Sequence, residues 1–192
     1  MDLLLCAFPP ELGPWLEEPP PGWRAACTGV GPLAAAAETL RLVLAHRPGR
    51  VLFLGTCGVY GEALGVGALV RAGRVIDHTL GEARGEAYRP GLQRSAWAAE
   101  VRPPFPEVTV LATPAITSSE AGALALGALG EVEHLELGGV AEACARGGVP
   151  FGAALAVANR VGPGAQEAWK AHHRAVCQAL REALEASGWL HA

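Results

Sequence analysis

The sequence predicts an α/β fold in which helices cover both faces of a twisted, mainly parallel β-sheet. Short apolar runs alternate with helical patterns along nearly the whole chain, and this order is typical of βαβ units. Of the 192 residues, 51% are hydrophobic, which is enough for a sizeable core. Glycine-rich segments follow several of the apolar runs, at the strand ends where such sheets bind ligands.

The first half of the chain begins with two short strands. Residues 3–7 form an apolar run that ends in a loop at "FPPE", and residues 24–28 form a second strand before the glycine turn "TGVGP". Residues 33–46 are rich in Ala and Leu at helical spacing and stop at "RPG", so we expect a helix. Residues 51–54 are the third strand, which we expect to end in a tight glycine turn at "GTCG".

The second half continues the alternation. Residues 67–77 contain short strand-like pieces, and residues 108–112 are an apolar strand. Hydroxyls followed by a carboxylate predict a helix N-terminus at Ser118 or Ser119. The remaining elements are an alternating segment at 132–137, a helix at 138–147, a strand at 151–158 and a long amphipathic helix at 167–187. Without repeats or a clear second unit, we expect one domain over residues 1–192.

Charge and composition exclude several classes of function. The net charge is -4 and the chain has a single lysine, Lys170, so nucleic-acid binding through a basic face is not expected. The N-terminus lacks the basic region of a signal peptide, and no apolar segment reaches the roughly twenty residues of a membrane span. We therefore expect a soluble, cytoplasmic protein that does not enter membranes.

Neither cysteines nor histidines form a metal-binding pattern. The five cysteines include no C-x-x-C pair, and an odd number of cysteines favours reduced thiols over a disulfide framework. His172 and His173 are adjacent and would point about 100° apart on a helix. We expect no metal and no cofactor.

Glycines and polar residues gather where the predicted strands end. These positions are residues 7–11, 28–31 and 55–61, with Glu136 and Asn159. Glycines let a ligand approach the backbone, whose N–H groups can then donate to it. However, "GTCGVYG" lacks the Lys-Ser/Thr pair of a P-loop and the dinucleotide G-x-G-x-x-G spacing. By itself it fits either a nucleoside pocket or a tight turn without a ligand.

Four motifs in order carry a resemblance to a known family. They are "TGVGPLAAA", "LGTCGVYG" with "GVGALV", "VEHLELGGVAEAC" and "ALAVANRVG". Together they resemble the purine nucleoside phosphorylase/nucleosidase superfamily, and within it most of all the futalosine hydrolases of an alternative menaquinone route. The resemblance implies a three-layer α/β/α fold around a mixed, partly barrel-like sheet, assembled as a homo-oligomer. It also implies that a purine nucleoside is hydrolysed at its N-glycosidic bond through an oxocarbenium-like ribose.

The resemblance assigns the sugar to Leu135 and Glu136. The superfamily has a Met-Glu pair here, and its carboxylate accepts hydrogen bonds from ribose hydroxyls. Leu135 keeps the apolar volume of Met, and an ionised Glu136 suits a diol that offers two donors. The alternative for Glu136 is a surface carboxylate, like Glu131 and Glu133 before it.

The resemblance also implies two catalytic residues, Glu11 and Asn159. A Glu near position 11 activates the attacking water in the nucleosidases. Asn159 replaces the Asp with which many nucleosidases protonate the purine; an amide cannot act as an acid but can hold the N7/O6 edge of hypoxanthine. The alternatives are a loop carboxylate for Glu11 and a turn or helix-cap residue for Asn159.

Phe53 indicates which nucleophile is used. Phosphorylases of the superfamily carry an Arg at this position, two residues before the "GT", to hold phosphate. Phe53 cannot bind an anion, so the resemblance implies that water attacks. Arg71, Arg74 or Arg84 could still supply a charge from elsewhere.

The walls of the site are expected to come from the glycine segments. Gly31, Thr56, Cys57 and Gly58 would provide backbone donors and wall atoms. Cys57 has no partner base near it in sequence, so we do not expect it to be a nucleophile. Hydroxyls of residues 113–119 could lie near the base or the 5′ group, and Trp169 is either core or a ligand contact.

Two other readings stay open. One is a different enzyme of the superfamily, either a methylthioadenosine/S-adenosylhomocysteine nucleosidase or a purine nucleoside phosphorylase. The other is a nucleoside-binding homologue with little turnover, because the chain is shorter than most members and residues 78–103 are brief for a lid.

Overall fold

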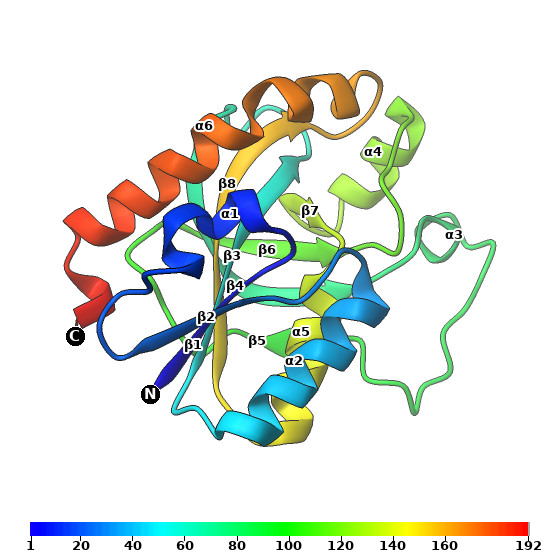
Figure 1. Ribbon diagram of the computed structural model, residues 1–192. Coiled ribbons are helices and arrows are strands. Elements are labelled where there is room, and N and C mark those ends of the chain that lie inside the picture. The colour runs from blue at the N-terminus through cyan, green and yellow to red at the C-terminus, as the bar shows by residue number, and fades with distance from the viewer. Residues whose placement is uncertain (192) are drawn as a thin grey trace.

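The computed structural model describes residues 1–191 and contains one sheet of eight strands (Figure 1). The strands are β1 (Asp2–Cys6), β2 (Trp23–Cys27), β3 (Val51–Val59), β4 (Leu69–Asp77), β5 (Ala96–Ala98), β6 (Glu107–Ala112), β7 (Val132–His134) and β8 (Phe151–Arg160). The strand order is β2-β1-β3-β7-β6-β4-β5, and β8 pairs with both β3 and β4. Strands β3, β7, β6, β4 and β8 therefore close into a ring, and β1 and β2 extend it from β3.

The sheet is mixed. Parallel pairing joins β1 to β2, β1 to β3, β3 to β8, β4 to β6 and β6 to β7. Antiparallel pairing joins β3 to β7, β4 to β5 and β4 to β8. The partly barrel-like mixed sheet that the resemblance implied is confirmed, and five of the eight pairings among the described strands are parallel, in agreement with the expected mainly parallel sheet.

Helices cover both faces of the sheet. The longer ones are α2 (Pro32–His46), α4 (Glu120–Gly127), α5 (Leu137–Gly147) and α6 (Ala165–Ala186), and the short ones are α1 (Pro9–Leu12) and α3 (Leu80–Ala83). In Figure 1, α2 and α5 lie together on one side of the sheet and α6 crosses the other side, close to α1. Single turns of 3-10 helix occur at Gly13–Leu16 and Trp189–His191.

Alternation along the strands builds a core on each face. Leu3, Leu5 and Phe53 point into the core shared with α2 and α5, whereas Leu4 and Leu52 point into the core under α6. All five side chains are fully buried, and each large apolar side chain contributes about 2 kcal/mol on burial. The two cores hold the strands rigidly and so fix the positions of the residues at their ends.

The expected helices are present, with small shifts at their ends. Ser119 is the N-cap of α4 and its hydroxyl accepts the N–H of Gly122, as the hydroxyl-rich sequence predicted. The short strand β5 and helices α1 and α3 were not predicted, because three or four residues are too few to show a period.

Two sequence expectations about strand ends are wrong. The strand at residues 51–54 does not stop at "GTCG"; β3 runs through these residues to Val59 because it pairs with β8 along its whole length. The alternating segment at 132–137 is a strand only as far as His134, and Glu136 is the N-cap of α5. The pieces expected at 67–77 form one continuous strand, β4.

Within residues 1–191, none of the helices combines the length and apolar character needed to cross a bilayer.

Candidate active site

A cavity of about 340 Å³ lies where β1, β3, β7 and β8 approach helices α1 and α6. Its lining is mainly apolar and aromatic, but it also contains three buried carboxylates, a buried histidine and a buried amide. The lining residues are Ala7, Phe8, Glu11, Val30, Thr56, Cys57, Gly58, Ile116, Glu133, His134, Leu135, Glu136, Asn159, Ala165, Gln166 and Trp169. Apolar walls with a few convergent polar groups are typical of small-molecule sites.

Glu11 is held by backbone donors from two sides. Its Oε2 accepts the N–H of Ala7 at 2.8 Å and that of Phe8 at 3.4 Å, and its Oε1 accepts the N–H of Thr56 at 3.1 Å. Its own carbonyl accepts from the guanidinium of Arg181 on α6 at 2.9 Å, which ties α1 to that helix. These hydrogen bonds fix the orientation of the carboxylate. The residue is almost fully buried, with 2% of its surface exposed.

The protonation of Glu11 is set mainly by its burial. Burial raises the pKa of Glu11 to about 8, and the N–H groups of Ala7 and Thr56 offset only part of this effect. The negative charge of Glu136 raises the pKa further. A carboxylate with a pKa near 8 is a far stronger base than an ordinary glutamate, so Glu11 is chemically suited to take a proton from water.

The glycines of β3 make room for these side chains rather than forming a turn. A Cβ at Gly55 would lie 2.9 Å from Nε2 of His134 and 3.3 Å from Oε1 of Glu11. A Cβ at Gly58 would lie 3.0 Å from Nδ2 of Asn159. The bare backbone is needed because polar side chains from β7, β8 and α1 approach β3 closely.

Glu136 and His134 lie beside each other at the start of α5. The Oε1 of Glu136 accepts the N–H of Gly31 at 2.8 Å, and the N–H of Glu136 donates to Nδ1 of His134 at 3.1 Å. Since Nδ1 accepts, the proton of the neutral imidazole is assigned to Nε2. Burial lowers the pKa of His134, and Glu136 opposes this effect more weakly, so the ring stays neutral at pH 7.

Because the imidazole of His134 is neutral, it does not donate a hydrogen bond to Oε2 of Glu136. Oε2 of Glu136 lies 3.3 Å from Nδ1 of His134, but Nδ1 carries no proton to give it. Oε2 can therefore accept hydrogen bonds from a molecule in the cavity. The carboxylate is buried, with 6% of the residue exposed, so such bonds would form away from bulk water.

Asn159 lies in β8, opposite Gly58 and next to a register shift between β3 and β8. Its Nδ2 donates to the carbonyl of Arg160 at 2.9 Å, and this bond fixes the orientation of the amide. The residue is buried, and one amide hydrogen and the oxygen are not used in that bond. The amide can offer both a donor and an acceptor to the cavity.

Aromatic side chains from α6 and the end of β1 form another side of the cavity. Trp169 donates its ring N–H to the hydroxyl of Thr56 at 3.0 Å and stacks on His173, with ring centres 4.3 Å apart. Phe8 packs against Trp169 at 5.7 Å. This side of the cavity suits a flat or apolar part of a ligand.

Comparison with known proteins identifies the family. A sequence model of the phosphorylase superfamily matches residues 24–187. The chain belongs to this superfamily. The futalosine hydrolase of Streptomyces coelicolor (strain ATCC BAA-471 / A3(2) / M145) is 33% identical over 177 residues, which cover 81% of this chain and 74% of that protein.

Solved structures share the phosphorylase-superfamily fold at low sequence identity. The native futalosine hydrolase of Helicobacter pylori strain 26695 matches with a TM-score of 0.81 and 16% identity, over 97% of both chains. The 5′-methylthioadenosine/S-adenosylhomocysteine nucleosidase of Helicobacter pylori, with butyl-thio-DADMe-Immucillin-A, matches with a TM-score of 0.82 and 14% identity, over 97% of both chains. These two similarities establish the fold.

The structure brings most of the predicted site residues together. Seven of the nine line the cavity: Glu11, Thr56, Cys57, Gly58, Leu135, Glu136 and Asn159. Gly31 is not in the lining, but it reaches the site through its N–H group, and its φ of 93° is one that glycine adopts easily.

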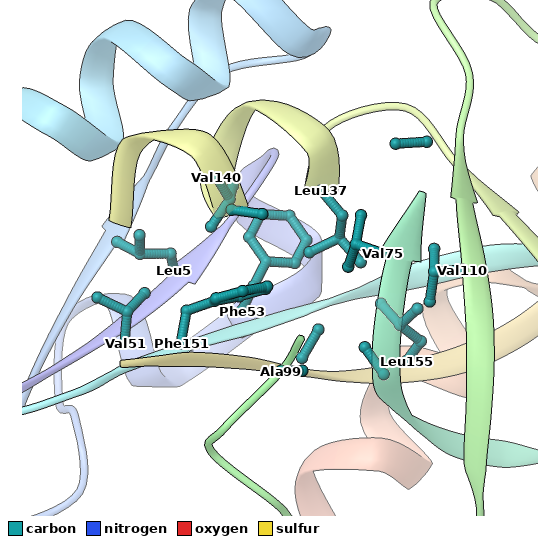
Figure 2. Close-up of a cluster of buried hydrophobic side chains, with 14 of the residues drawn as sticks. Leu5, Val51, Phe53, Val75, Ala99, Val110, Leu137, Val140, Phe151 and Leu155 are labelled. Carbon is teal, nitrogen blue, oxygen red and sulfur yellow. The ribbon is translucent and has the colours of Figure 1, made fainter. Parts of the chain in front are cut away.

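Phe53 is the exception, and its expected place in the site is wrong. It is fully buried in the core between the sheet and α5, and Figure 2 shows its ring among Leu5, Val140 and Leu137. It meets the site only indirectly, through an edge-on contact with His134 at 5.2 Å between ring centres. Phe53 lies three residues before Thr56 on β3, so its side chain points to the opposite face of the strand, into the core.

Sequence reasoning missed His134 and the burial of Glu133. Both lie in β7, which is paired on both sides within the ring of strands and is buried throughout. Polar and apolar residues alternate from Glu131 onward, and this pattern suggested a surface position for Glu133. The pattern could not reveal that the ring of strands buries both faces of β7. Ile116 is the residue of the 113–119 segment that lines the cavity, so the expected hydroxyl contacts from this segment are not among the lining residues.

A second and larger cavity of about 760 Å³ lies between α2, α5 and residues 92–97. Its lining includes exposed Leu33 and Leu92. Of its charged residues, Glu142 pairs with Arg146 at 2.6 Å and accepts from Trp97 at 3.2 Å, and Asp77 pairs with Arg89.

Proposed function

We propose that the chain is a nucleosidase that hydrolyses the N-glycosidic bond of a purine nucleoside, with futalosine as the substrate and hypoxanthine as the released base. The observation that carries this proposal is that two buried carboxylates and a buried amide face one cavity, whose described lining contains no Lys or Arg. Membership of the phosphorylase superfamily and the 33% identity to a futalosine hydrolase support it.

The lining favours water over phosphate as the nucleophile. A phosphate dianion in a closed site needs a cationic partner, because an unpaired buried charge is very costly. None of the residues described as lining the 340 Å³ cavity is a Lys or an Arg. Arg71, which could have supplied a charge, lies away from the lining and pairs with Glu107 at 2.7 Å.

The ribose would bind at Glu136. Its Oε2 can accept from the 2′- and 3′-hydroxyls while Oε1 stays on Gly31. A carboxylate that binds these hydroxyls also places negative charge beside a sugar that becomes positively charged in the transition state. Leu135 would cover the sugar as an apolar neighbour.

Glu11 would activate the water. As the bond from C1′ to the base breaks, its electron pair leaves with the base, and the water oxygen bonds to C1′. Glu11 takes the proton that the water loses. The N–H groups of Ala7 and Thr56 keep the receiving carboxylate in place during this transfer.

Asn159 would hold the leaving base. Its amide can hydrogen-bond to the N7/O6 edge of hypoxanthine and stabilise the charge that develops there, but it cannot protonate the ring. The resemblance assigns departure of adenine in the methylthioadenosine nucleosidases to an acid at this position, and Asn159 cannot act as an acid. This favours futalosine over methylthioadenosine as the substrate.

The test is to incubate the purified chain separately with futalosine and with methylthioadenosine, with and without inorganic phosphate, and to measure the free base by chromatography. We expect hypoxanthine from futalosine at a rate that does not depend on phosphate. Adenine release from methylthioadenosine alone would assign the other nucleosidase activity, and a rate that requires phosphate would assign a phosphorylase. Release of neither base would leave a nucleoside-binding homologue.

We also infer that the chain works as a homo-oligomer in the cytoplasm. Exposed apolar side chains, among them Leu33, Leu92 and Leu124, support association. Light scattering coupled to gel filtration measures the mass, and a mass of about 20 kDa at micromolar concentration would contradict this inference.

A further inference from the structure

Glu133 faces the cavity, yet donors of the protein already occupy both of its oxygens. It lies in β7 and is 5% exposed. Oε2 accepts the hydroxyl of Tyr60 at 2.7 Å, and Oε1 accepts the N–H of Thr117 at 3.0 Å. Oε2 of Glu136, in contrast, faces a nitrogen that carries no proton. Glu133 therefore acts through the groups that it binds within the protein.

The two donors come from very different parts of the structure. Tyr60 follows β3 directly, is 5% exposed and packs with Leu111 and Leu126. Its N–H donates to the carbonyl of Glu131 at 2.9 Å, so both its backbone and its side chain are fixed. Thr117 lies in residues 113–119, which have no helix or strand and join β6 to α4.

Residues 113–119 form one wall of the cavity, through Ile116. Next to Ile116, Thr117 makes two backbone hydrogen bonds: its N–H donates to Glu133, and its carbonyl accepts from Gly162 at 3.2 Å. Gly162 is three residues beyond Asn159, so this wall stands on the side of the cavity assigned to the base. A segment without regular structure depends on such individual bonds for its position.

We propose that Glu133 is a positioning residue that, together with Tyr60, fixes the wall at Ile116 and thereby sets how tightly the base end of the nucleoside is held. This inference rests on the proposed function for the identity of the ligand. Tyr60 is the rigid anchor and Thr117 is the movable end. The carboxylate joins them, and the Thr117 side chain also interacts directly with the Tyr60 hydroxyl. Glu133 uses both of its oxygens for bonds within the protein, and Tyr60 is not among the residues that line the cavity.

The inference predicts a change in KM with little change in kcat. The variants are Tyr60→Phe, which removes only the hydroxyl, Glu133→Leu, which removes both acceptors, and Glu133→Gln, which keeps one acceptor for Thr117. With futalosine, we expect KM to rise roughly fivefold in Tyr60→Phe and more than about tenfold in Glu133→Leu, with kcat within about twofold. Glu133→Gln should retain most of the wild-type affinity.

Hydrogen exchange provides a second reading that does not depend on activity. Amides of residues 113–119 should exchange faster in Tyr60→Phe and Glu133→Leu than in the wild type. The matched control is Glu131→Gln, two residues before Glu133. The carboxylate of Glu131 accepts the N–H of Thr109 in an exposed hydrogen bond. This control should leave both KM and exchange unchanged.

Each outcome decides the inference separately from the proposed function. If the wild type releases no base, the proposed function fails, and exchange in Tyr60→Phe still decides whether Glu133 and Tyr60 hold the wall. Unchanged KM and exchange in Tyr60→Phe would overturn the inference, even if Glu133→Leu does not fold. A large fall in kcat with constant KM would also overturn it, because Glu133 would then act in the reaction itself.

Discussion

The two cavities described above differ in chemistry as well as in size. The larger one, of about 760 Å³, is lined by exposed leucines and by charged groups that include Arg94 and the ion pair of Glu142 with Arg146. The smaller one, of about 340 Å³, holds Glu11, Glu133 and Glu136, all less than 7% exposed, with no Lys or Arg in its described lining. Volume alone would point to the larger cavity.

The difference in chemistry shows that the smaller cavity is where the protein bears an unfavourable free energy of burying charged groups. Burying carboxylates without a cation is unfavourable, and the raised pKa of Glu11 is the direct expression of that cost. Such groups concentrate at functional sites because chemistry uses them. The comparison between the cavities can therefore be tested by changes in each of them.

The largest effect is expected for Glu11→Gln. The amide keeps the shape of the side chain but cannot take a proton from water, so kcat should fall by about 10³-fold. Circular dichroism would establish that the variant is folded, and Glu131→Gln is the control for removal of a carboxylate. A kcat within tenfold of the wild type would remove Glu11 from the reaction.

The second effect is a dependence on pH. The base must be ionised to act, and the pKa of Glu11 is raised to about 8, so activity is present above this value and is lost as pH falls through it. We expect kcat/KM to drop by roughly 100-fold between pH 9 and pH 6, measured as a full profile. A profile that is flat from pH 6 to 9 would contradict the assignment.

The stability of Glu11→Gln is the control for this pH effect. Between pH 4.5, the ordinary value, and about 8, the folded chain binds a proton at Glu11 that the unfolded chain releases. This group therefore makes the folded state less stable as pH rises through that window. Glu11→Gln lacks the effect, so its melting temperature should fall less than that of the wild type between pH 6 and 9.

A smaller effect is expected for Glu136→Gln. The amide can still accept from Gly31 but presents a less negative group to the ribose, so kcat/KM should fall by roughly 30-fold. A 2′-deoxynucleoside lacks one of the two hydroxyls, so the same substitution should cost less with that substrate. An equal loss with both substrates would separate Glu136 from the 2′-hydroxyl.

A further step down is expected for Asn159→Leu, which removes the hydrogen bonds to the leaving base. We expect kcat to fall by about tenfold, measured with futalosine at saturation. Unchanged turnover would mean that the base leaves without help from this amide.

The smallest effect is expected in the larger cavity. Arg146→Ala removes an exposed ion pair with Glu142 within α5, and such pairs contribute less than about 1 kcal/mol to stability. Activity should stay within about twofold of the wild type. A large loss would show that the larger cavity takes part in the reaction.

The sequence predicts the fold class and the family, and both are confirmed, because they depend on the order of many elements and motifs. Local details depended on contacts that the sequence does not display. The glycines at 55 and 58 looked like a turn, yet they lie inside β3 and leave room for His134, Glu11 and Asn159. Their role became visible only once the side chains that approach them were placed.

The site residues were predictable to a similar degree. Glu11 and Glu136 follow β1 and β7, and Asn159 lies next to the last residue of β8, so their convergence could be expected from topology. Phe53 and Glu133 could not be placed, because which way a strand residue points depends on the pairing on both sides of the strand. Ring closure through β8 turned Phe53 into the core and buried Glu133.

A crystal structure of the chain soaked with hypoxanthine tests the central claim most directly. The account predicts the base in the smaller cavity, with its N7/O6 edge against the amide of Asn159 and Ile116 beside it. Hypoxanthine bound in the larger cavity, or away from Asn159, would contradict it.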